Sequence, residues 1–259
     1  MRPALPPGAL AASLLLLPAT LAAPTPFSVA DDSFSDASAT VRLKVLRNSA
    51  TGESASVAVS HGGGVETLAL RSPRRGALRS VLWTHDRNAT AVALNADWRG
   101  RMLIPYGNRI GGAKYTFNGS EHHLPVNDVM PCTPPLVCVK NSLHGLLWNR
   151  SMHVVASHAG PENASVTLRY DFPGSDPGYP FKLRTEITYT LGTQQRTHAR
   201  ASLFTVSVKF VNMDVGGWAL PVYNGWHPYL LCHTYKSVVT LDPCVRPLSP
   251  FPNRRRRWP

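Results

Sequence analysis

The chain after residue 40 is dominated by short segments in which apolar and polar side chains alternate. In the segment 182–191, for example, polar Glu186 and Thr188 alternate with apolar Ile187 and Tyr189. A period of two residues places the apolar side chains on one face of a half-buried strand. Segments with this pattern, or rich in β-branched and aromatic residues, predict strands at Val41–Leu46, Ala55–Val59, Val65–Leu70, Val92–Trp98, Lys114–Phe117, Val166–Phe172, Lys182–Leu191 and Leu203–Val211.

Turn-forming residues separate the predicted strands. They stand at 62–64 (Gly-Gly-Gly), at Asn118-Gly119, at 173–178 (Pro-Gly-Ser-Asp-Pro-Gly) and at Asn224-Gly225. The sequence shows no convincing helical periodicity with caps, no internal repeat and no interdomain linker. The pattern therefore predicts an all-β protein, formed as a large antiparallel β-sandwich.

The first residues have the pattern of a secretory signal peptide. Arg2 supplies a positive end, residues 9–17 an apolar run, and residues 20–23 small side chains for cleavage. A membrane anchor is the alternative, but Pro18 interrupts the run, which is too short to span a bilayer. We interpret residues 1–23 as a signal peptide and expect no membrane association after its removal.

Two segments flank the predicted domain of residues 41–246. Residues 24–40 are rich in Ser, Ala and Asp and are expected to form a flexible leader. Residues 247–259 are rich in proline and contain four consecutive arginines, which is not how a strand-rich domain normally ends. We expect this basic tail to lie outside the domain.

Two further features fit a secreted protein or one in the secretory lumen. Sequons of the form Asn-x-Ser/Thr stand at Asn88, Asn118, Asn149 and Asn163 and would accept glycans where they are exposed. The even number of cysteines allows disulfides, and the simplest of three connectivities joins Cys132 to Cys138 and Cys232 to Cys244. Reduced buried cysteines are the alternative. The absence of a Cys-x-x-Cys pair argues against a zinc site.

The net charge is strongly positive. Lysine and arginine number 27 against 15 acidic residues, giving a formal charge of +12. The basic residues are scattered, apart from clusters at 71–79 and 254–257, and neither cluster is interleaved with stacking aromatics. Nucleic-acid binding is therefore not expected, and the charge is interpreted as a solvated face.

Three short stretches contain residues that could carry chemistry. The first is 105–110 with the following hairpin, the second is 141–148, and the third is 224–229. Singly each has a plain structural interpretation, because an arginine in a turn usually forms an ion pair and a histidine before glycine usually packs. Their order along the chain carries more information. The residues concerned are Asn108, Arg109, His144, Trp148, Trp226, His227 and Tyr229.

Taken in order, these stretches resemble the aldose 1-epimerase (galactose mutarotase) family over roughly residues 60–242. The family runs from an Asn-Arg-Ile turn, through a Phe-x-x-Asn-Gly-x-x-x-x-Leu hairpin, to a Leu-His-Gly element. An Asn-x-x-His-x-Tyr element follows about 80 residues later. In this chain the matching elements are Asn108-Arg109-Ile110, Tyr115–Leu124, Leu143-His144-Gly145 and Asn224–Tyr229. The turn within 165–191 also resembles a family hairpin.

The resemblance implies a galactose mutarotase-like supersandwich that interconverts the α and β anomers of free hexoses such as glucose and galactose. It implies that His227 is the general acid, that His144 is a second catalytic histidine at the ring oxygen, and that Arg109 binds sugar hydroxyls, with Asn108 beside it. The reaction needs no metal or nucleotide cofactor. An imidazole with a pKa of about 6.5 suits a general acid at neutral pH. Trp226, Tyr229 and Trp148 could face the sugar or pack in the core.

The sequence departs from the family in its last part. The family's sugar-binding aspartate and its general base, a glutamate, both lie well beyond the Asn-x-x-His-x-Tyr element. Only residues 228–259 follow His227, and Asp242 is the one acidic residue among them. Asp128, Asp171, Asp176 and Glu186 are interpreted as turn or solvent-facing groups, so no carboxylate can be assigned as the base.

The expected fold is consequently incomplete at its C-terminus. A truncated or mis-spliced product, or a partner chain that supplies the missing half, would explain this. An aldose 1-epimerase-like isomerase is the leading interpretation. A non-catalytic carbohydrate-binding sandwich is the alternative, and a basic surface-interaction protein is a third. The small-molecule partner in the first two is a hexose.

Overall fold

The computed structural model describes residues 25–72, 76–129, 138, 140–196, 199–215 and 219–231, with side chains at 195, 196, 199 and 200 left out. The segments interpreted as signal peptide and basic tail lie outside these residues. Of the four cysteines only Cys138 is described. It is disulfide-bonded, and its partner lies outside the described part of the chain.

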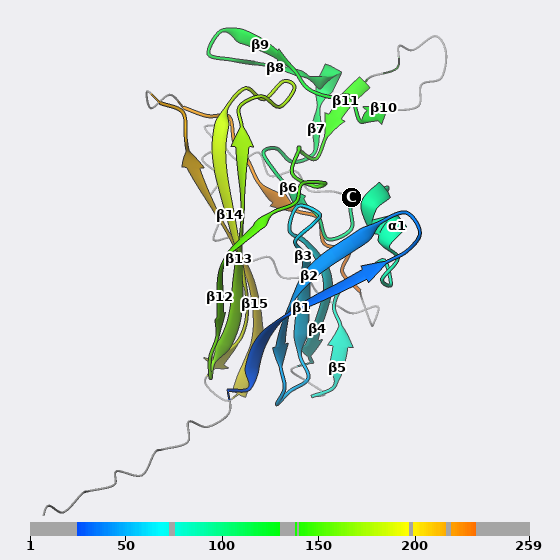
Figure 1. Cartoon of the computed structure of the whole chain (residues 1–259), viewed down its shortest axis with the longest axis vertical. Coiled ribbons are helices and arrows are strands. Elements are labelled where there is room, and N and C mark those ends of the chain that lie inside the picture. The colour runs from blue at the N-terminus through cyan, green and yellow to red at the C-terminus, as the bar shows by residue number, and fades with distance from the viewer. Residues whose placement is uncertain are drawn as a thin grey trace, which may run out of the picture.

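Two antiparallel sheets form the body of the protein (Figure 1). The first has the order β1-β2-β3-β4-β5, and the second the order β12-β13-β14-β15. Their strands are β1 (Phe27–Ser35), β2 (Thr40–Asn48), β3 (Ser54–Ala58), β4 (Gly64–Arg71), β5 (Leu78–Ser80), β12 (His153–Ala159), β13 (Asn163–Pro173), β14 (Lys182–Arg196) and β15 (Ala199–Asn212). The all-β antiparallel architecture predicted from the alternating pattern is confirmed.

The core lies between the two sheets. Leu46 and Val57 of the first sheet and Leu168 and Ile187 of the second are fully buried in one cluster. They are the apolar members of the alternating pattern, so each strand turns one face inward. Polar partners on the other face pair across strands, as in the register of Arg169 with Glu186.

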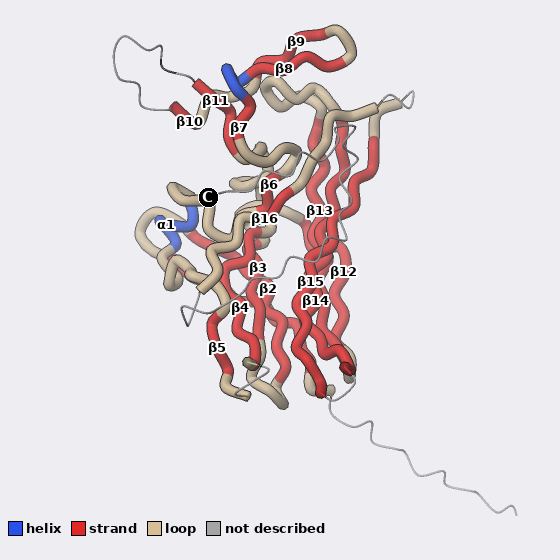
Figure 2. The backbone as a smooth tube through the Cα atoms, turned by 180° about the vertical axis from the view of Figure 1, so that it is seen from behind, coloured by secondary structure: helices blue, strands red, loops and turns tan. Residues whose placement is uncertain are grey.

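The strand predicted at Val92–Trp98 is wrong, because this region begins with the helix α1 (Ala89–Leu94). Its N-cap is Asn88, whose side chain accepts a hydrogen bond from the amide of Ala91. Ala89 and Val92 pack on the outer face of the first sheet, in a second cluster with residues of β2 and β3. Figure 2 shows α1 on the side of the first sheet away from β12–β15.

The segment expected to be a flexible leader contains a regular strand. Phe27–Ser35 forms β1 and pairs with β2 along its whole length, from Phe27 opposite Asn48 to Ser35 opposite Thr40. Phe27 is buried in the main core. The expectation is therefore wrong for this part, since Phe27 and Val29 on one face and Phe34 on the other anchor the strand despite its Ser and Asp content.

Small sheets and a hairpin sit at one end of the sandwich. They comprise β6 (Met102–Leu103), β7 (Arg109–Ile110), the 3-10 turn η1 (Gly111–Ala113), β8 (Lys114–Phe117), β9 (Ser120–His123), β10 (Asp128–Val129), β11 (Lys140–Leu143) and β16 (Gly225–Trp226). β6 pairs with β16, and β11 lies between β10 and β7. These pairings bring the three sequence stretches of interest to one end of the molecule. No helix in the described ranges is long and apolar enough to cross a bilayer.

Candidate sugar site

His144 is fixed by its neighbour Asn108 through two hydrogen bonds. The amide of His144 donates to the carbonyl of Asn108 at 3.1 Å, and the amide of Asn108 donates to Nδ1 of His144 at 3.1 Å. A backbone amide can only donate, so Nδ1 must carry the lone pair and the proton of the neutral ring must sit on Nε2. His144 thus presents an N–H donor from Nε2.

His227 follows β16 and is held by the turn that precedes β6. Its amide donates to the carbonyl of Arg101 at 3.0 Å, and its carbonyl accepts from the amide of Gly100 at 2.9 Å. The imidazoles of His144 and His227 meet edge to face, with centroids 5.0 Å apart. Nδ1 of His227 is buried and has no hydrogen-bond partner among the described residues. The two histidines named from the sequence are therefore direct neighbours.

Aromatic side chains continue the histidine pair on both sides. Tyr229 stacks on His227 with centroids 5.4 Å apart, and Trp98 meets His144 at 4.9 Å. Trp148 contacts Trp98 at 5.6 Å. Trp226 differs, because its indole N–H donates to the carbonyl of Gly100 at 3.2 Å and its ring packs against the main core. Of the aromatic candidates, Tyr229 therefore touches the histidine pair and Trp226 supports the backbone.

Burial controls the protonation of His144. The residue is 9% exposed, and the pKa of its imidazole is lowered from 6.5 to about 4, chiefly by desolvation. The neighbouring His227 and Arg109 contribute to this lowering, and Asp128 opposes it. His144 is consequently neutral at physiological pH, which agrees with its hydrogen bond from Asn108.

Arg109 reaches the site from β7, where it pairs in register with Leu143 beside His144. Its Nε donates to Oδ2 of Asp128 at 2.8 Å, and Asn141 donates to the same oxygen at 2.9 Å. These bonds lower the pKa of Asp128, and the bond from Arg109 has the largest effect. The side chain of Asp128 is only 16% exposed, whereas that of Arg109 is 45% exposed and can reach a ligand.

The acidic residues expected in turns or facing solvent are placed differently. Asp128 lies in β10 and orients Arg109, and Asp176 is buried and bonded to Arg150 at 2.6 Å. Glu186 and Asp171 form cross-strand ion pairs with Arg169 and Arg184. The expectation is wrong for Asp128, which lies in a strand and whose carboxylate is held largely out of solvent by Arg109. Asp176 lies in a turn as expected, closed by the hydrogen bond from the amide of Tyr179, but its carboxylate is buried against Arg150. None of these four residues places an unpaired carboxylate beside the histidines.

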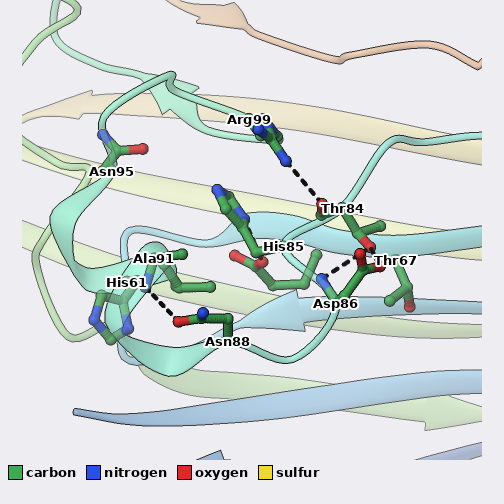
Figure 3. Close-up of polar contacts among 12 residues, drawn as sticks. His61, Thr67, Thr84, His85, Asp86, Asn88, Ala91, Asn95 and Arg99 are labelled. Carbon is green, nitrogen blue, oxygen red and sulfur yellow. Dashed lines mark hydrogen bonds and ion pairs between the residues drawn. The ribbon is translucent and has the colours of Figure 1, made fainter. Parts of the chain in front are cut away.

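A buried polar cluster supports the backbone that carries His227. Arg101 is fully buried and donates to Oε1 of Glu66 at 3.0 Å and to Oδ1 of Asn95 at 2.8 Å. Figure 3 shows the neighbouring loop, in which the guanidinium of Arg99 donates to the carbonyl of Thr84 at 2.9 Å. The segment 98–101 is thereby tied to the first sheet, and the backbone atoms that hold His227 belong to this segment.

A groove of about 400 Å³ lies elsewhere, on the outer face of the first sheet near α1. Several of its polar side chains are already paired with one another. Ser56 bonds to Thr67 at 2.7 Å, and Arg87 donates to Asp32 at 2.8 Å. Size alone therefore does not make this groove the better candidate, since several of its polar side chains already bond to one another.

Sequence reasoning missed two residues of the site. Asp128 was interpreted as a turn or solvent-facing residue, because its pairing with Arg109 depends on the β10-β11-β7 sheet. The spacing of residues along the sequence does not predict that sheet. Trp98 was placed at the end of a strand, although its ring lies against His144. Among the described residues, no group of His, Cys, Asp or Glu side chains is arranged to hold a metal ion.

Residues 45–241 match the family model for aldose 1-epimerase. The chain belongs to the aldose 1-epimerase family. It is 34% identical over 134 residues to the uncharacterized protein YihR of Escherichia coli strain K12. That match covers 52% of this chain and 36% of YihR, so the chain spans little more than a third of this curated relative.

Solved structures of the aldose 1-epimerase family are similar only over part of their length. A galactose 1-epimerase from Lactobacillus acidophilus is 15% identical with a TM-score of 0.47, over 64% of this chain and 45% of that chain. A homologue from C. elegans is 20% identical with a TM-score of 0.43, over 63% of this chain and 42% of that chain. A galactose mutarotase-like protein from Clostridium acetobutylicum is 17% identical with a TM-score of 0.44, over 63% of this chain and 46% of that chain. We base no argument about the site on these likenesses.

Proposed function

We propose that this end of the sandwich binds a free hexose and belongs to an aldose 1-epimerase-like isomerase. The observation that carries the proposal is the contact of the His144 and His227 rings at 5.0 Å, beside an exposed guanidinium of Arg109. A planar guanidinium offers several donors to paired hydroxyls. Family membership supplies the reaction class, and the site supplies donors suited to a cyclic sugar.

In the proposed reaction the sugar ring opens and recloses on either face of the aldehyde. His227 gives a proton to the ring oxygen as the anomeric hydroxyl loses its own, and His144 donates a hydrogen bond from Nε2 to the same region. A positioned acid contributes roughly 10²–10⁴-fold. The anomeric proton needs a base, and we infer that the described residues do not provide one, because Asp128 is engaged by Arg109 and Asn141.

The experiment measures binding and turnover separately. D-Galactose and D-glucose are titrated into the whole chain by calorimetry, and mutarotation is followed by polarimetry with and without added acetate as an external base. We expect binding, slow turnover, and an acetate-dependent increase that His227→Gln abolishes. Acetate catalysis in the absence of protein is subtracted. Absence of hexose binding would refute the proposal.

A non-catalytic carbohydrate-binding sandwich is the second candidate. The observation that favours it is the same lack of a free carboxylate next to the histidines in the described residues. It predicts hexose binding that survives His227→Gln, with no turnover at any acetate concentration. The isomerase predicts that His227→Gln removes the acetate-dependent rate.

We also propose that the protein enters the secretory pathway and is glycosylated. The signal-like residues 1–23 support entry, and the exposure of Asn88, Asn118 and Asn149 supports their use as acceptors. Asn163 lies half-buried in β13, so it is the weaker acceptor. Expression in eukaryotic cells should give a secreted protein whose mass falls on glycosidase treatment, and the combined variant Asn88→Gln, Asn118→Gln and Asn149→Gln should remove most of that fall. A product retained in the cytosol without glycans would contradict this.

A further inference from the structure

Three residues around the histidine pair have left-handed backbone conformations that are uncommon outside glycine. These are Trp98 with φ of 62°, Asn108 with 58° and His144 with 62°. Asparagine adopts this conformation readily, whereas a bulky tryptophan there is an outlier. Such strain persists only where surrounding structure enforces it, and it concentrates at binding sites.

The surroundings of Trp98 do enforce its position. The amide of Arg101 donates to the carbonyl of Trp98 at 3.2 Å, and the amide of Val65 donates to the carbonyl of Gly100 at 2.9 Å. Gly100 has φ of 69°, and a Cβ there would collide with the carbonyl oxygen of Val65. The turn 98–101 is therefore pressed onto the first sheet. The same turn supplies both backbone bonds to His227.

Packing alone does not explain the indole at this position. Trp98 is half-buried and is not a member of either hydrophobic core cluster of the described residues. Its ring contacts the imidazole of His144 at 4.9 Å and the indole of Trp148 at 5.6 Å. The strained turn thus places a partly exposed aromatic ring directly beside a proposed catalytic histidine.

We propose that Trp98 is a sugar-binding residue, whose indole packs against the apolar C–H side of a hexopyranose while His144 and Arg109 bond to its oxygens. The proposal rests on the proposed sugar site. Aromatic rings give a large apolar contact area with fixed geometry, and sites of this kind combine such walls with a few polar groups. Trp98 would therefore select a pyranose ring over an open-chain polyol of similar hydroxyl content.

The test compares ligands and variants on the whole chain by calorimetry. D-Galactose and D-glucose are the pyranoses, and galactitol is the open-chain control. Trp98→Leu keeps apolar bulk but removes the aromatic ring, and Trp98→Phe keeps a ring. We expect Trp98→Leu to weaken hexose binding about tenfold, the loss of roughly one aromatic contact, and Trp98→Phe to weaken it less than threefold. Phe34→Ala, at a half-buried aromatic on the α1 side of the first sheet, should leave binding unchanged.

A second measurement keeps the proposal falsifiable if a variant folds poorly. The imidazole of His144 is titrated by NMR in the wild type and in Trp98→Phe, with circular dichroism to check the fold. An unchanged pKa of His144 in Trp98→Phe, together with wild-type hexose affinity in Trp98→Leu, would overturn the sugar-binding role of Trp98. The proposed function would be unaffected by that result. Wild-type protein that binds neither hexose overturns the proposed function and this inference together. Galactitol binding as tight as that of galactose overturns the selection of a pyranose ring.

Discussion

Asn108 and His144 lie 36 residues apart and exchange two hydrogen bonds, one through the backbone and one from the Asn108 amide to the imidazole Nδ1. Both residues have left-handed backbone conformations. The reciprocal pair joins the turn before β7 to the turn after β11. It therefore fixes the ring orientation of His144 and the direction of the chain that leads to Arg109.

The tautomer of His144 should be a single one at neutral pH. Because the Asn108 amide donates to Nδ1, the proton of the neutral imidazole is expected on Nε2. Two-dimensional ¹⁵N–¹H NMR of the imidazoles distinguishes the two forms by their nitrogen shifts. Exposed His158 in β12 is the matched control, since no hydrogen bond among the described residues fixes its tautomer. An Nδ1–H signal for His144 would show that the bond to Asn108 is not formed in solution.

The low pKa of His144 should make stability depend on pH. Its pKa is about 4 in the folded protein and about 6.5 in the unfolded chain. Between these values the unfolded chain binds a proton that the folded protein does not. The contribution is therefore complete above pH 6.5 and is lost as the pH falls towards 4, by at most about 1.4 kcal/mol per pH unit.

Urea unfolding at several pH values checks this dependence. The free energy of unfolding of the wild type should decline from pH 6.5 to 4 more steeply than that of His144→Gln. The comparison of slopes removes the pH-independent cost of the substitution. His158→Gln should keep the wild-type slope. Equal slopes for wild type and His144→Gln would contradict the pKa shift.

The strands of the two sheets were predictable because the pattern that predicts each of them lies within a short stretch of the sequence. The alternation in β13 and β14 needs only a period of two, so the strands and their buried faces follow from the sequence. α1 was missed because Ala89–Leu94 is only six residues long and its N-cap Asn88 was interpreted only as a sequon. β1 was missed because polar residues outnumber apolar ones in it.

The site was predictable only in part. His144 and His227 followed from ordered motifs of a known family, and their contact confirms that the fold brings those motifs together. Trp98 and Asp128 could not be found, because their importance comes from long-range pairing. Asp128 meets Arg109 through a small sheet, and Trp98 meets His144 through a strained turn held by Val65.

Gly145 should be indispensable to the position of His144. It has φ of 80°, and a Cβ there would collide with the carbonyl oxygen of Ile104. Gly145→Ala combines left-handed strain with overpacking, so we expect a loss of about 2–5 kcal/mol in unfolding free energy. Gly119, with φ of 77° in open space, is the control, and Gly119→Ala should cost about 1 kcal/mol. Equal losses in urea unfolding would show that the contact with Ile104 is relaxed in solution.

Substitution of Arg101 should lower the free energy of unfolding more than substitution of any other charged residue. Arg101 holds the segment whose backbone bonds to His227. Its guanidinium is fully buried and satisfied by Glu66, Asn95 and the carbonyl of Val92. Arg101→Met leaves the buried Glu66 without its guanidinium partner, with His85 beside it at 3.5 Å, and should lower the unfolding free energy by about 3–5 kcal/mol. Adding Glu66→Gln should recover part of the loss, because the orphaned charge is removed.

The control for Arg101 is an exposed pair of the same chemistry. Arg184 donates to Asp171 at 2.9 and 2.8 Å, but the carboxylate is 48% exposed. Solvent screens such pairs, so Arg184→Met should change the unfolding free energy by only about 0–1 kcal/mol. Chemical denaturation of the four proteins measures these differences. Equal losses for the two arginine variants would mean that water reaches Arg101. Arg101 would then not be what holds the backbone segment that bonds to His227.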